Sequence, residues 1–150
     1  MKTNNEMVFE HLWKYFEIHA QQRMAVFNYY IVIAGATLTG IGFCLQQGAG
    51  YNYMTSFLSF FLMLSSFLFW KLDDRVSTLI KEVEFALIDF EKNISSDKYA
   101  IFTNDKNNRA LSSSFISTWS FGKCFRYSFS IMGYLGFIMI FLPHFITLTN

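Results

Sequence analysis

A chain of 150 residues has room for about one domain, and we expect a single helical unit over residues 1–150. Hydrophobic residues make up 53% of the chain and charged residues only 15%, which argues against a water-soluble globule and for a lipid environment. The net charge of +1 gives no strong positive field, so the composition does not support direct binding of nucleic acid.

The first predicted element is an amphipathic helix over residues 5–23. Its apolar residues recur at helical spacing on one side, and its charged and amide residues lie on the other side. We expect this helix to lie on or just below the membrane surface and to run into the first membrane span. The apolar side carries Phe9, Leu12, Trp13, Phe16 and Ala20.

A long charge-free stretch follows, from Met24 to Trp70, without Asp, Glu, Lys, Arg or His. A helix needs about 20 apolar residues to cross a hydrocarbon core of about 30 Å, so the stretch is long enough for two spans. Its polar middle, residues 46–52, contains two glutamines and two glycines, which are typical of a turn at the water interface. The sequence therefore predicts spans at about 25–45 and 53–71.

Small residues are concentrated in the first of these spans and recur in the third. Such residues allow another helix backbone to approach closely. One interpretation is self-association into a ring or pore; the other is packing against the second or third span of the same chain. The predicted packing seam consists of Gly35, Ala36, Thr39, Gly40 and Gly42, with Gly133 and Gly136 as its counterpart in the third span.

The entrance to the first span carries four polar residues that are candidates for a switch or a partner contact: His19, Gln22, Arg23 and Asn28. The imidazole and guanidinium would pair with acids of the central region or with a headgroup phosphate. The alternative is interfacial anchoring, with Arg23 extending to the cytoplasm. Asn28, one turn inside the span, is expected to face another helix, because an unpartnered amide is costly in lipid.

The region 72–126 is rich in charges and is expected to be cytoplasmic. Its first part, to about residue 93, repeats apolar residues at intervals of three and four, which predicts a helix that continues out of the second span. Residues 93–110 contain many turn formers and are predicted to be a loop. Residues 110–122 are predicted to form a short helix in the interface.

The third predicted span covers about residues 127–148, which contain no acid and His144 as the one basic group. Every Lys and Arg of the chain lies either at or before Arg23 or within residues 71–126. The positive-inside rule then predicts a multi-pass protein of the inner (plasma) membrane, with its N-terminus in the cytoplasm and its C-terminus outside.

The sequence contains few combinations of residues that could support catalysis. We therefore expect no enzyme activity, catalytic residue, cofactor or metal site. No pair of carboxylates, nucleophile with its base, phosphate-binding glycine loop or cluster of metal ligands is present. The charge-free spans also argue against an ion-coupled transporter, because such proteins carry a buried acid or base in the membrane.

The order His-x-x-Gln-Arg-Met-x-x-Phe-Asn-Tyr-Tyr at residues 19–30, before two spans and a charged helix, resembles small multi-span membrane proteins of prokaryotic antiviral defence. These include the membrane accessory proteins of type VI-B CRISPR loci and related effectors of defence operons. The resemblance implies an effector that forms homo-oligomers in the bilayer and permeabilises or depolarises it when triggered. Some members carry an Arg-x4–6-His nuclease motif, which is absent here, so nuclease activity is not implied.

Two functions therefore remain in competition. The first is the anti-phage membrane effector just described, a non-enzymatic homo-oligomer whose partner is the lipid bilayer. The second is a membrane anchor without a pore, which recruits a soluble defence protein on the cytoplasmic side through its N-terminal helix and residues 71–126.

Overall fold

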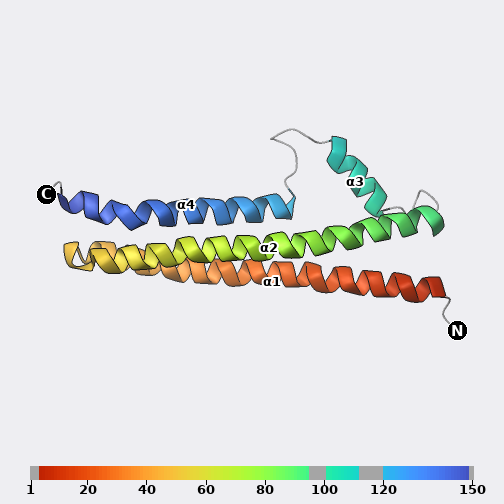
Figure 1. The fold of residues 1–150 in the computed structure, drawn as a ribbon, viewed down its shortest axis with the longest axis horizontal. Coiled ribbons are helices and arrows are strands. Elements are labelled where there is room, and N and C mark those ends of the chain that lie inside the picture. Colours follow the sequence, from red (N-terminus) through yellow and green to blue (C-terminus); the bar gives the residue numbers. More distant parts are fainter. Residues whose placement is uncertain (1–3, 95–100, 112–119, 149–150) are drawn as a thin grey trace. The chain divides into compact units, whose positions relative to one another are not determined.

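The structure, a computed structural model, describes residues 4–94, 101–111 and 120–148. Over these residues it is all-α, with no strand, which confirms the predicted fold class (Figure 1). Three of its helices are long and apolar enough to cross a membrane, as predicted. The elements are α1 (Asn4–Gln46), the short 3-10 helix η1 (Ala49–Tyr51), α2 (Asn52–Ile94), α3 (Ile101–Leu111) and α4 (Phe121–Leu148).

The N-terminal segment and the first span form one uninterrupted helix, α1, which confirms that residues 5–23 run into the span. Their placement at the membrane surface stays a prediction. The helix ends at the predicted turn, where the backbone N–H of Gln47 donates to Phe43 and that of Gly48 to Leu45. Gly48 has a φ of 87°, a conformation that favours glycine because it has no Cβ. Helix α2 then begins at Asn52 and continues beyond the second span to Ile94, as predicted.

The predicted loop over residues 93–110 is wrong for its second part, because α3 occupies Ile101–Leu111. The carboxylate of Glu91 accepts hydrogen bonds from the backbone N–H groups of Phe102 and Thr103, both at 3.1 Å. It therefore satisfies two of the N–H groups that the first turn of a helix leaves unpaired. Of the short helix predicted at 110–122, residues 112–119 lie outside the described residues. Helix α4 contains the whole of the third predicted span and begins six residues before it, at Phe121.

The chain forms two compact units. The first comprises residues 1–23 and 75–120, and the second comprises residues 24–74 and 121–150. In the first unit, aromatic rings join the helices: Phe9 stacks on Phe90 at 5.3 Å between ring centroids, and Phe102 of α3 meets the edges of Trp13 and Phe16 at 6.2 and 5.5 Å.

The second unit contains parts of α1, α2 and α4 around an aromatic core. Phe27 stacks on Phe125 with 4.0 Å between the ring centroids, and Tyr30 meets Phe129 edge-on at 4.6 Å. Contacts of this kind supplement the burial of apolar area by about 0.5–1.5 kcal/mol per pair. The buried residues of this core are Tyr30, Ala34, Ile41, Leu62, Phe125 and Phe129.

Candidate functional site

The interior of the second unit contains hydroxyl groups, and the helices themselves satisfy them. Ser59 donates to the carbonyl of Thr55 at 2.7 Å and Ser66 to that of Leu62 at 2.8 Å, in each case one turn back along α2. The hydroxyl of Tyr30 lies 2.9 Å from Oγ of Ser66 and links α1 to α2. These hydroxyls are therefore satisfied within α2 or, for Tyr30 and Ser66, between α1 and α2 of one protomer, and we assign them a structural role.

The glycines of α4 pack against α2 of the same chain. A Cβ added at Gly136 would lie 2.9 Å from the carbonyl oxygen of Ser59 and 2.9 Å from the backbone nitrogen of Met63. A Cβ at Gly133 would meet the Cβ of Ser66 at 3.4 Å, which is an ordinary contact. Both glycines thus belong to the contact between α2 and α4.

The small residues of α1 divide between two faces. Gly40 faces inward, since its Cβ would lie 3.2 Å from Leu58, whereas a Cβ at Gly35 or Gly42 would have no atom within 4 Å. Ala36 and Thr39 are also exposed. The predicted seam therefore contains an inward part at Gly40 and an outward part formed by the other four residues.

Five residues on the outer side of α1 lie at heptad spacing. Asn28, Gly35 and Gly42 are seven residues apart, and Val32 and Thr39 lie four residues after the first two of them, so all five share one face. The amide of Asn28 is exposed and has no hydrogen-bond partner among the described residues. We call this set, Asn28, Val32, Gly35, Thr39 and Gly42, the outward face of α1.

The other polar residues at the entrance to the span belong to the first unit. The rings of His19 and Tyr15 lie 4.2 Å apart, and Nδ1 of His19 is buried without a hydrogen-bond partner among the described residues. Gln22 is exposed and Arg23 is half-buried. Asn28 belongs to the second unit, and whether these four residues act together remains a prediction.

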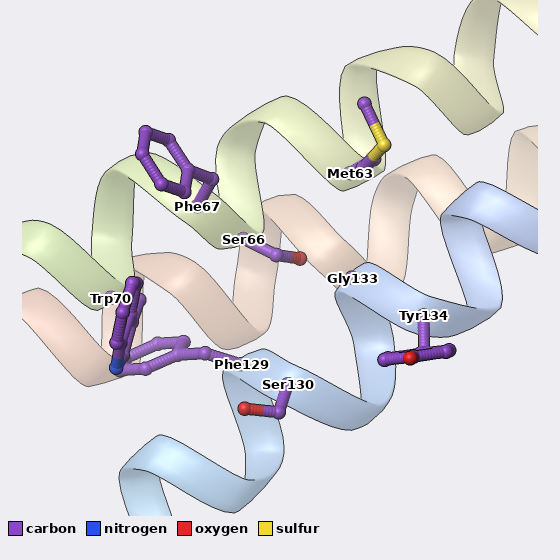
Figure 2. Close-up of a pocket in the computed structure, with 8 residues that line it drawn as sticks. All are labelled: Met63, Ser66, Phe67, Trp70, Phe129, Ser130, Gly133 and Tyr134. Atoms are coloured by element: carbon purple, nitrogen blue, oxygen red, sulfur yellow. The ribbon is translucent and has the colours of Figure 1, made fainter.

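Sequence reasoning missed a pocket between α2 and α4. It has a volume of about 240 Å³. Figure 2 shows Trp70 and Phe129 at one end of it and Met63 and Tyr134 at the other. The signal that points to it is the pairing of small residues, Ser66 and Gly133, between large aromatic ones. The lining residues are Met63, Ser66, Phe67, Trp70, Phe129, Ser130, Gly133 and Tyr134.

Charged side chains lie next to the end of the pocket formed by Trp70. Nζ of Lys71 lies over the ring of Trp70, 5.0 Å from its centroid. Arg126 lies one turn before Ser130 and forms an exposed ion pair with Asp74 at 3.4 Å. The charge of Arg126 is therefore balanced within the protomer, whereas Lys71 has no carboxylate partner among the described residues.

At the opposite end of the second unit, α2 and α4 are joined by polar contacts. The hydroxyl of Ser56 donates to the carbonyl of Ile140 at 2.7 Å, and its oxygen lies 3.0 Å from Nε2 of His144. The amide of Asn52 donates to the carbonyl of Pro143 at 3.4 Å. These contacts connect the start of α2 to the last turns of α4.

One relative supplies the link to known proteins. CD-NTase-associated protein 19 of Escherichia coli is 51% identical to this chain over 134 residues, which cover 89% of the chain and 89% of that protein. No family model and no solved structure matches the chain.

Proposed function

Since the chain belongs to the family of CD-NTase-associated protein 19, we propose that it acts in anti-phage defence, as a membrane effector that self-associates and permeabilises or depolarises the bilayer when triggered. The name of the relative supports a setting in which a CD-NTase is present, in line with the antiviral resemblance of residues 19–30. The narrower resemblance to type VI-B CRISPR accessory proteins stays a prediction.

The proposal of self-association is supported mainly by the outward face of α1. In lipid, helices gain little from burying apolar side chains against one another, so they associate where small residues permit close backbone contact and where polar groups find partners. Gly35 and Gly42 have open space around them, and the amide of Asn28 lies on the same face. A second copy that packs α1 against α1 would bring backbones together at the glycines and offer each Asn28 a partner.

Association also fits the way in which a small protein would open a membrane. Three helices do not enclose a channel, so a path for ions would form between copies. The hydroxyl of Thr39 donates to the carbonyl of Gly35 at 2.9 Å, and its oxygen retains the capacity to accept from water. Such a path would be lined by hydroxyls and backbone carbonyls in place of charges.

We further propose that the protein lies in the inner membrane with its N-terminus in the cytoplasm and its C-terminus outside, and that it acts without enzymatic activity. The distribution of Lys and Arg supports this orientation. In the first unit, Glu91 and the rings around Phe102 hold α3 in place, which would give a trigger or a soluble defence protein a folded surface to recognise.

The alternative is an anchor that recruits a soluble partner and forms no pore. Exposed apolar side chains of the first unit favour it, since Trp13 is 45% and Phe85 59% exposed. Apolar groups of this size at a surface are typical of contact sites. On this alternative, substitutions on the outward face of α1 would leave function intact.

A depolarisation assay separates the two proposals. Cells that express the protein and carry a potential-sensitive dye are challenged with phage, and we expect depolarisation with the wild type and its loss with Gly35→Leu or Gly42→Leu. Leucine at these positions leaves the protomer intact, because no atom lies within 4 Å, but keeps two α1 helices apart. Gly40→Leu is a less specific probe, because a side chain at this position would also clash with Leu58 of the same protomer.

The matched control is Gly50→Leu, a glycine in the turn with equally open surroundings. This control should depolarise as the wild type does. Wild-type expression that protects cells from phage without changing the membrane potential, while a soluble protein co-purifies with it, would contradict the effector proposal and favour the anchor.

A further inference from the structure

The pocket between α2 and α4 has the size and chemistry of a site for an alkyl chain. Its volume of about 240 Å³ exceeds the ~150 Å³ of a cavity that holds benzene, and it lies below the range of about 300–1,000 Å³ that is usual for drug-sized ligands. It is open at one side, between two helices that are apolar enough to span a membrane. Lipid chains would therefore have direct access to it.

The polar atoms of the pocket do not favour a polar occupant. Ser66 donates its hydrogen to the carbonyl of Leu62, and Ser130 donates its hydrogen to the carbonyl of Arg126 at 2.8 Å. Both hydroxyl donors are thus committed to the helix backbone. The two serines therefore offer an occupant only acceptor oxygens, and the other lining residues are Met63, Gly133 and four aromatic residues.

The charged end of the pocket favours an anionic headgroup. Lys71 is the first charged residue after the apolar stretch, and its ammonium group lies over Trp70, a ring type that prefers the membrane interface. Basic groups between helices at the cytoplasmic side are a known means of binding anionic lipid headgroups. Arg126 contributes less, because Asp74 balances its charge.

We propose that this pocket binds one anionic phospholipid of the cytoplasmic leaflet, with an acyl chain against Gly133 and Ser66 and the phosphate next to Lys71. The inference rests on the proposed membrane placement and orientation, and it is independent of pore formation. A second copy is a poorer occupant, because the acids closest to this depth, Asp73 and Asp74, are buried and paired with Arg126, respectively, within the protomer.

The test uses Trp70 as a reporter. Trp13 and Trp119 are replaced by Phe, and the full chain is reconstituted in phosphatidylcholine vesicles that contain a minor fraction of lipid brominated in its acyl chains, either phosphatidylglycerol or phosphatidylcholine. Bromine quenches tryptophan fluorescence at short range. We expect Trp70 to select the brominated phosphatidylglycerol about fivefold over the brominated phosphatidylcholine, the preference that one Lys near a headgroup provides.

Two variants test the headgroup contact and the acyl-chain pocket separately. Lys71→Gln should make the two brominated lipids equally effective, whereas Gly133→Leu should fill the pocket and remove the selective quenching. A Cβ is tolerated at Gly133, and circular dichroism of that variant checks that it folds. Should it fail to fold, Lys71→Gln alone decides the headgroup claim. Ile138→Leu, on an exposed part of α4 away from the pocket, should behave as the wild type does.

Three results would overturn the inference. Equal quenching by the two lipids in the wild type would mean that the pocket selects no lipid, although the membrane placement would stand. Quenching weaker than that of a tryptophan exposed to bulk lipid would mean that protein, such as a second copy, covers the pocket. No quenching by either lipid would refute the membrane placement as well.

Discussion

Of the two glycines through which α4 contacts α2, Gly136 lies closer to the α2 backbone, and Gly133, three residues earlier, is not equally constrained. Gly136→Ala would place a methyl group 2.9 Å from two backbone atoms of α2, which cannot move as a flexible side chain would. We expect it to lower the free energy of unfolding in detergent by about 1–3 kcal/mol, the usual cost of overpacking. Denaturant titration followed by circular dichroism measures this change.

Gly133→Ala is the matched control, since the same methyl group would make an ordinary contact of 3.4 Å with Ser66. Its stability should remain within about 0.5 kcal/mol of the wild type, the range of changes that disturb no special feature. Equal destabilisation by the two substitutions would contradict the close approach at Gly136.

These small residues can be recognised in the sequence, but the sequence does not show which of them face the protein interior and which face outward. On a water-soluble helix, polar side chains mark the outer face, so periodicity reveals which side is buried. In a membrane span both the lipid and the protein interior are apolar, and that signal is lost. Gly40 and Gly42 are two positions apart in the same apolar run, yet one faces Leu58 and the other faces outward. Only the packing of α2 against α1 distinguishes them.

Among the elements, α3 depends most clearly on contacts distant in sequence. Glu91→Ala removes the acceptor for the N–H groups of Phe102 and Thr103 and for the hydroxyl of Thr103. We expect a local loss of about 1 kcal/mol, the usual value of a helix cap, and hence about fivefold faster amide hydrogen exchange in residues 101–111. Mass spectrometry of the exchanged peptides measures the rate.

Glu82→Ala, an exposed acid on the same helix α2, serves as the control and should leave exchange in α3 unchanged. If Glu91→Ala also leaves it unchanged, the aromatic contact of Phe102 with Trp13 and Phe16 holds α3 without the cap.

The contrast between α3 and the longer helices explains what could be predicted from sequence. The charge-free stretch of α1 and α2 and the apolar run of α4 are local signals, because lipid demands about 20 apolar residues from each span. Asn104, Asp105 and Asn107 have low helix propensity, and they led to the prediction of a loop. The helix cap that outweighs this low propensity comes from Glu91, ten residues before α3. Neither this cap nor the contact of Phe102 with Trp13 and Phe16 can be recognised in the sequence of residues 101–111.

For the whole molecule, the distribution of Lys and Arg predicts one orientation, which fusion proteins can test. Alkaline phosphatase, which is active only outside the cytoplasm, should be active when fused after Asn150 and inactive when fused after Ile94 of α2. A fluorescent protein that matures in the cytoplasm should give the opposite pattern. Activity of phosphatase after Ile94 would reverse the orientation and would move Lys71 away from the cytoplasmic leaflet.

The contact between Ser56 and His144 has a consequence for protonation. A hydroxyl carries one hydrogen, and Ser56 donates it to the carbonyl of Ile140. The contact of 3.0 Å with Nε2 is then a hydrogen bond donated by the imidazole, which requires the Nε2–H tautomer. In this tautomer the imidazole donates toward α2 through Nε2 and keeps Nδ1 as its acceptor nitrogen. The junction of α2 and α4 at Ser56 thus fixes which ring nitrogen of His144 carries the hydrogen.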